Sequence, residues 1–213
     1  WQSVKRVHRG HHLTLLEMVR ETLRLARKAD HIGALDSDAN SPTSQAERVL
    51  NQENQSVALM EWNFNHRYDV TLTPNGDDKV VLPDGTIFID SYGSDSWRNV
   101  TALGGDDATE DRFLYDLDEN VDTFTGTIKV HYKILYELDC QPVWIQKYLC
   151  ARAAKAMIDP IRSPELFILL EREENTRLQE ARRIDENQRD RNVFNTERGR
   201  RLKGGRYWTG WSW

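Results

Sequence analysis

The sequence DANSPTSQAERVLNQENQSVALMEWNFN, residues 38–65, decides how this chain is expected to fold. It opens with the signals of a helix N-terminus, because Ser41 precedes Pro42 and a proline suits the first helical position, where its missing N–H is not needed. Ser44 and Glu47 have the spacing of a capping box and offer an alternative start three residues later. The stretch therefore predicts a helix that begins near Ser41, after a capping loop that contains Asp38 and Asn40.

The same stretch predicts that its helix runs directly into a sheet. An apolar stripe continues along the helix and is interrupted only by the polar turn Glu53-Asn54; its members are Ala46, Val49, Leu50, Val57 and Met60. The tetrapeptide Trp62-Asn63-Phe64-Asn65 follows and leads into strand-forming sequence. We expect Trp62 and Phe64 to anchor the end of the helix.

Three further helices are expected outside this stretch. The first covers about residues 13–28, where apolar residues recur at helical spacing. Another follows Pro142 and consists mostly of small and apolar residues. The last begins at Ser163-Pro164-Glu165, which combines a cap, a proline in the first turn and an acid near the positive end of the helix dipole. It should reach about Asn187, with a thin apolar stripe in its second half that a monomer cannot bury deeply.

Residues 66–140 have the character of an antiparallel sheet. Expected strands alternate polar and apolar residues or flank the turn Pro83-Asp84-Gly85, and they cover about residues 69–73, 80–82, 86–89, 113–115 and 127–134. The predicted class is thus α+β: a bundle of about four helices with an inserted antiparallel β domain and an extended C-terminal tail. The expected divisions are an N-terminal helical hairpin (1–65), the β domain (66–140), a C-terminal helical hairpin that packs on the first (141–190) and the tail (191–213).

Charge is segregated along the 213 residues, although the net charge is only −5. Residues 66–140 carry sixteen acidic and six basic groups, whereas residues 189–213 carry seven basic and two acidic groups. Residues 1–35 are also basic. An acidic middle with basic ends suggests complementary surfaces between copies or with a partner, and it argues against a nucleic-acid-binding role for the whole chain.

The remaining composition points to a protein that folds in a reducing compartment. Cys140 and Cys150 fit neither a disulfide framework nor a zinc spacing, and we expect both to be reduced core residues. The sequence shows no membrane-spanning run and no secretory signal. Its first residue is Trp1 rather than methionine, so a preceding segment is left open.

The C-terminal segment 198–213, RGRRLKGGRYWTGWSW, is the expected partner interface. It has too little aliphatic content to fold alone, yet its aromatic residues favour burial against a partner. The expected interface residues are Arg198, Arg200, Arg201, Lys203, Arg206, Tyr207, Trp208, Trp211 and Trp213. Docking onto another chain is preferred here; docking on its own chain and a DNA contact through the arginines stay open.

Several motifs in fixed order resemble one known family. They are Asp38-Ala39-Asn40, Arg48-Val49-Leu50-Asn51, Trp62-Asn63-Phe64-Asn65, Val70-Thr71-Leu72, Tyr115-Asp116, a turn with Phe124, the strand 128–135, the acidic stretch from Glu137 to Pro142, the small residues 151–156 and the acidic helix 164–187. Together they resemble tail tubular protein A, the head-to-tail adaptor family of short-tailed bacteriophages. The resemblance covers about residues 12–190 and leaves out both basic ends.

The resemblance implies a structural protein of the virion neck, assembled in the host cytoplasm. Its relatives form a ring of twelve copies beneath the portal, pass the genome through the lumen, and receive the tail nozzle (a tail tubular protein B) and in many cases the fibres. It further implies no catalytic activity, no cofactor and no membrane, and only transient contact with DNA. We expect the C-terminal segment to hold the portal.

The residues leave three other kinds of chemistry to consider. Positions from Asp36 to Glu47 follow a calcium-loop spacing, but Ser41 stands where the sharp turn needs glycine, and a capping loop explains them equally. Acids in the β domain (Asp106, Asp107, Glu110, Asp111, Asp116, Asp118, Glu119 and Asp122) could serve a cell-wall hydrolase, the alternative function. They lie in polar loops where a raised pKa is not expected. The histidines are read as a basic arm (His8, His11 and His12) or as scattered single residues (His31, His66 and His131).

Overall fold

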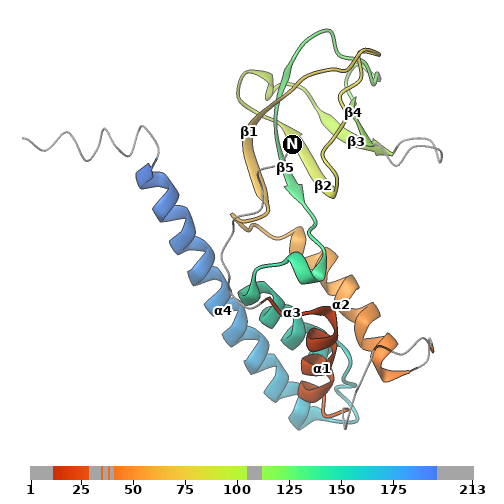
Figure 1. The fold of residues 1–213 in the computed structure, drawn as a ribbon, viewed down its shortest axis with the longest axis vertical. Coiled ribbons are helices and arrows are strands. Elements are labelled where there is room, and N and C mark those ends of the chain that lie inside the picture. Colours follow the sequence, from red (N-terminus) through yellow and green to blue (C-terminus); the bar gives the residue numbers. More distant parts are fainter. Residues whose placement is uncertain (1–11, 29–34, 36–37, 39–40, 105–111, 196–213) are drawn as a thin grey trace, which may run out of the picture.

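The computed structural model of the chain describes residues 12–28, 35, 38, 41–104 and 112–195, with side chains up to residue 188. Four helices stand at one end of the molecule and a β domain at the other (Figure 1). The class is α+β, as predicted. Chain order is helix, helix, five strands, helix, helix, so the β domain lies between two pairs of helices in the sequence.

The helices begin where local signals place them. Helix α1 (Leu15–Leu25) has a capping box, in which Thr14 Oγ1 accepts from the backbone N–H of Glu17 and the Glu17 carboxylate accepts from that of Thr14. Helix α2 (Pro42–Ala58) has Ser41 as its N-cap and Pro42 as its first residue, which confirms the first of the two predicted starts. Ser44 instead donates its N–H to the Ser41 hydroxyl.

Helix α3 (Val143–Ala156) is the centre of the bundle and packs against α1, α2 and α4. Its residues Ile145, Tyr148, Leu149 and Ala153 are fully buried, as is Gln146, whose side chain bonds to the backbone of Leu13 and Leu138. Cys150 is buried, and burial raises the pKa of its thiol to about 12. Cys140 is exposed, so the expectation of two core cysteines is wrong for that residue; both thiols are free.

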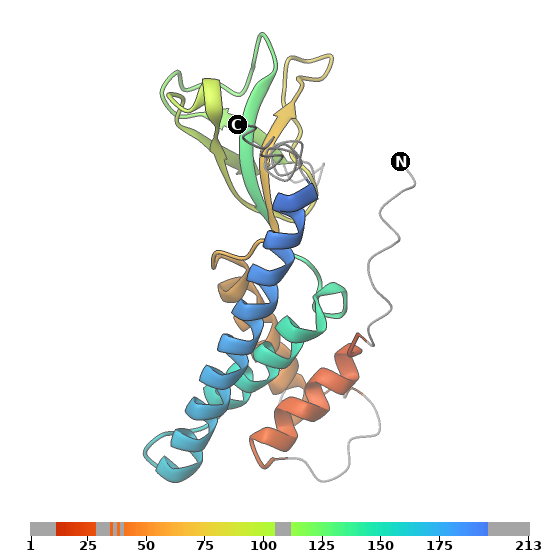
Figure 2. The same cartoon turned by 90° about the vertical axis from the view of Figure 1, so that its left-hand side faces the viewer.

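Helix α4 (Pro164–Asn195) is the longest element and extends past the bundle towards the β domain (Figure 2). It begins at Pro164 as predicted and continues eight residues beyond the expected end. Leu170 and Ala181 are buried, while Ile168 and Leu169 on its first turns are about half exposed. The described side chains of its second half, up to residue 188, are mostly exposed, in agreement with its thin apolar stripe.

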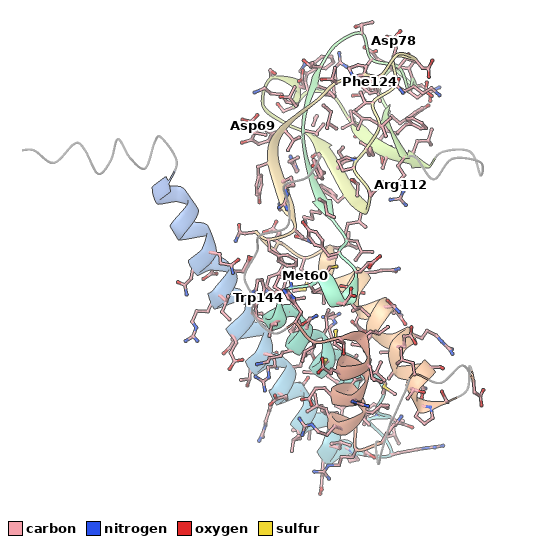
Figure 3. All side chains as sticks on the ribbon, viewed as in Figure 1. Met60, Asp69, Asp78, Arg112, Phe124 and Trp144 are labelled. Carbon is pink, nitrogen blue, oxygen red and sulfur yellow. The ribbon has the colours of Figure 1, made fainter. Side chains whose placement is uncertain are left out.

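The β domain consists of two antiparallel sheets around a second core. Strands β1 (His66–Leu72), β5 (Ile128–Ile134) and β2 (Thr86–Ser91) form one sheet in the order β1-β5-β2, and β3 (Val100–Gly104) pairs with β4 (Arg112–Asp116). Between the sheets lie Val80, Leu82, Ile89, Val100, Leu114, Phe124, Ile128, Val130 and Tyr132. Figure 3 shows Phe124 inside this domain.

Two details of the sheet prediction are corrected. Residues 80–82 lie antiparallel to β4 but form only one isolated bridge, between Val81 and Phe113, with two backbone hydrogen bonds to β4, and so do not make a full strand. Strand β3 was not foreseen, since Val100 and Ala102 alone give weak alternation. The predicted turn at Gly85 is present with φ +74°, and a Cβ there would lie 2.7 Å from the Leu135 carbonyl oxygen.

Candidate assembly interface at the helix–sheet junction

The tetrapeptide Trp62-Asn63-Phe64-Asn65 joins the helices to the sheet. Trp62 is 2% exposed and donates its indole N–H to the Val57 carbonyl at 2.9 Å. Its ring centroid lies 5.8 Å from that of Trp144, and Phe64 meets Trp144 edge to face at 5.3 Å. Figure 3 places Trp144 and Met60 at this boundary. These aromatic contacts fix the end of α2 against α3.

Asp185 of α4 closes the junction from the other side. Its Oδ2 accepts hydrogen bonds from both the backbone N–H and the side-chain amide of Asn63 at 2.8 Å, and its Oδ1 accepts from the backbone N–H of Phe64 at 3.2 Å. Asp185 is 3% exposed. Sequence reasoning missed it, although it lies on the same helical stripe as Leu178 and Ala181, at spacings of three and four residues.

A second polar network connects the junction to the start of the C-terminal helices. Asn54 donates to the Tyr136 carbonyl at 2.9 Å and accepts from the Gln141 amide at 2.8 Å. The side-chain amide of Asn65 donates to the Ala58 carbonyl, and the backbone carbonyl of Asn65 accepts from the N–H of Ile134. The polar turn that interrupts the stripe of α2 therefore faces the protein interior, where Asn54 is 4% exposed.

Glu53 of the same turn pairs with Arg152 of α3. Burial alone would lower the pKa of Arg152, but hydrogen bonds with Glu53 and Tyr148 outweigh it and raise that pKa. Arg152 thereby stays charged between α2 and α3, and the pair fixes their register.

The residues proposed as sites from the sequence are distributed unevenly. Trp62 and Phe64 lie at the junction. Asp38 is exposed and its carbonyl accepts from the N–H of Ser41 at 3.0 Å, while Asn40 lies outside the described residues, as does Asp36 of the calcium-like spacing. All nine partner-interface residues of the C-terminal segment also lie outside the described residues, and their role stays a prediction.

The described β-domain carboxylates hold turns together. Asp116 is buried and its Oδ1 accepts from the N–H groups of Asp118 and Glu119, while Asp118 accepts from the N–H of Asn99. Asp122 pairs with Lys79 at 2.8 Å, and that hydrogen bond lowers its pKa, the direction opposite to that of a glycosidase acid. The other acids, Asp106, Asp107, Glu110 and Asp111, lie outside the described residues.

The outward face of the three-stranded sheet carries five rings and one lysine, a group that we call the outer sheet face: His66, Tyr68, Phe88, Tyr92, His131 and Lys133. His131 lies at its centre, with ring centroids 5.3 Å from His66, 5.7 Å from Phe88 and 5.9 Å from Tyr92. The expectation that His66 and His131 are scattered single residues is wrong, because β1 and β5 are neighbours. His131 points outward because Val130 and Tyr132 point into the core.

A cavity of about 560 Å³ lies at the foot of the outer sheet face. Its walls combine the junction, the start of β1 and the second half of α4; they are Met60, Glu61, Trp62, Asn63, Tyr68, Arg182, Asp185 and Glu186. Tyr68 belongs both to this junction cavity and to the outer sheet face. The two features therefore form one continuous surface.

His66 makes the stability of this region pH-dependent. Burial, together with the charges of His131 and Lys133, lowers its pKa from 6.5 to about 4. Between these values the unfolded chain binds a proton that the folded chain does not, so stability is full above pH 6.5 and falls as pH drops towards 4. Allowing for solvent screening, we expect about 1–2 kcal/mol from this group. Urea unfolding should show that the free energy of unfolding falls less between pH 7 and pH 4.5 in His66→Gln than in the parent chain, by this amount. Equal falls in the two chains would contradict the assignment.

Taken together, the described residues form an α+β structural module, in which the buried polar groups fix helices and sheets to one another. Comparison with known families agrees with this class. The family model described as Tail tubular protein matches residues 26–191, which is most of the chain. The chain belongs to the tail tubular protein family and is a structural protein of a bacteriophage tail. The comparison with curated proteins found no match. Among the described helices, none is both long and apolar enough to cross a bilayer.

Proposed function

We propose that this protein is the head-to-tail adaptor of a short-tailed bacteriophage, assembled in the host cytoplasm. Copies would stand side by side in a ring of twelve between the portal and the tail nozzle, with fibres as further partners and the genome passing through the lumen. The family match over residues 26–191 carries the proposal. No catalytic step and no cofactor are part of it.

The arrangement of the molecule supports this function. It is elongated, with helices at one end and the β domain at the other, which gives separate surfaces for two axial partners (Figure 1). A ring also needs two different lateral surfaces on each copy. The described part of residues 66–140 carries twelve acidic and six basic groups, and this net negative charge would favour contact with a basic surface on a neighbouring copy.

Electron microscopy of the purified chain mixed with portal particles tests the proposal. We expect a twelvefold ring seated on the portal, with the channel continuous between the two. Particles without added density at the portal, or density with another symmetry, would contradict the proposed assembly.

The C-terminal segment is the proposed portal contact. Deletion from Arg198 should leave the fold of the remaining chain intact, because these residues have little aliphatic content to add to a core. It should abolish co-sedimentation with portal particles. One variant replaces only the tryptophans (Trp208, Trp211 and Trp213) and another only the arginines. Comparing their portal binding shows whether burial of aromatic side chains or positive charge causes the binding. Portal binding that survives the deletion would refute this contact.

A further inference from the structure

The outer sheet face has no covering element among the described residues. Tyr68 is 56% exposed, Tyr92 is 40% exposed and Phe88 is 37% exposed, and all three surround His131. Exposed aromatic residues gathered on one sheet face are unusual for a surface that stays in water. The face has the composition of a contact surface, rich in aromatic rings and with a polar rim.

Two groups of this face, His66 and Lys133, present no outward charge at neutral pH. The low pKa of His66 keeps its imidazole uncharged there. His66 Nε2 and His131 Nδ1 are buried and have no hydrogen-bond partner among the described residues. Lys133 does not point its charge outward, since its ammonium group donates to the Leu59 carbonyl at 2.9 Å.

The described chain ends at the level of the β domain. Helix α4 rises past the junction to Asn195, and its C-terminal end stands in front of the sheet at the level of β1 (Figure 2). Eighteen residues follow, from 196 to 213. The first eleven of these can span at most roughly 36–40 Å when fully extended, which is more than the roughly 30 Å diameter of a small domain, so the last seven can reach the β domain.

The chemistry of these last residues matches that of the surface. Residues 198–206 carry five basic groups, and residues 207–213 carry Tyr207 and three tryptophans. The junction cavity at the foot of the sheet is lined by three carboxylates (Glu61, Asp185 and Glu186) and one basic group (Arg182), so its wall is net acidic, and the ring cluster adjoins it at Tyr68. Indole N–H groups can also donate to the tyrosine hydroxyls of the face.

We propose that, in the free chain, residues 207–213 dock on the outer sheet face of their own molecule while residues 198–206 cross the rim of the junction cavity. This contact would cover two apolar surfaces that are both costly to expose. It concerns the protein before assembly and does not require the adaptor ring. In the proposed virion the same segment would have to leave this face to reach the portal.

Photo-crosslinking in the full-length chain tests the docking directly. A benzophenone amino acid at Phe88 should yield crosslinks to residues 207–213, identified by mass spectrometry. The same probe at Ile161, which is 89% exposed in the connection between α3 and α4, should not. In a mixture of isotopically light and heavy chains, the two peptides of each crosslinked pair should carry the same label, because both come from one molecule. Mixed pairs would overturn docking within one molecule, and equal yields from both positions would overturn the docking site.

Limited proteolysis supplies a second measurement that needs no probe. Trypsin releases residues 207–213 only after cleavage at Arg206, and protection follows the population of the docked state. The double variant Tyr68→Ser with Phe88→Ser should release this peptide about tenfold faster than the parent chain. The matched control Ile168→Ser with Leu169→Ser also removes two partly exposed apolar side chains and should leave the rate unchanged. Equal rates in all three chains would overturn the proposal, and melting curves identify any variant that fails to fold.

Discussion

Replacing Trp62 with alanine should lower the free energy of unfolding by about 3–5 kcal/mol, the range for truncation of a large buried aromatic side chain. Trp62 is almost fully buried and contacts Phe64, Trp144 and Tyr148. The substitution also leaves the Val57 carbonyl without its indole donor. Because the junction sets how the sheet stands on the helices, we expect ring assembly to fail as well.

Trp97→Ala is the matched control for this substitution. Trp97 is 65% exposed and stacks on Arg98, so its removal should change the unfolding free energy by less than about 1 kcal/mol. Chemical denaturation of both variants gives the comparison. A Trp62→Ala variant that melts like the parent chain would show that the junction is not part of the core.

Asp185→Ala should be the second largest loss, about 2–4 kcal/mol. The substitution leaves the backbone N–H groups of Asn63 and Phe64 without their acceptor, and buried donors that lose a charged acceptor carry a penalty above the usual range for a hydrogen bond. It also removes the only hydrogen bonds described between the second half of α4 and the tetrapeptide. We expect residues 181–188 of α4 to become less protected in turn.

Hydrogen exchange resolves this effect residue by residue. The amides of Asn63 and Phe64 should exchange faster in Asp185→Ala, together with those of α4 from Ala181 onward. Glu186→Ala is the control, because Glu186 is an exposed neighbour on the same helix. Unchanged protection at Asn63 and Phe64 would mean that the carboxylate does not hold the junction.

Local signals in the sequence were sufficient for the helix starts and for the main strand. Pro42 and Pro164 begin α2 and α4 because a proline at the first helical position loses no hydrogen bond. Strand β5 was recognised because its alternation separates the core residues Ile128, Val130 and Tyr132 from outward ones. Both signals lie within a few residues of one another in the chain.

The missed features all depend on partners far away in the sequence. Asp185 looks like one more acid in a charged helix until Asn63, more than a hundred residues earlier, is placed against it. Strand β3 has little side-chain pattern and is specified by its pairing with β4. The exposed Cys140 was misjudged because its short 3-10 turn (Leu138–Cys140) buries Leu138 instead.

The amino-acid order by itself determined the class of the fold, the helix beginnings and the acidic character of the middle of the chain, because these follow from backbone preferences and local composition. Only the tertiary structure decided which polar residues are buried and which rings meet. Asn54 and Asp185 become buried when α2 and α4 pack, and His66 joins His131 when β1 pairs with β5. Hydrogen bonding and ring contact depend on distance in space, and that distance is set only when the elements pack together.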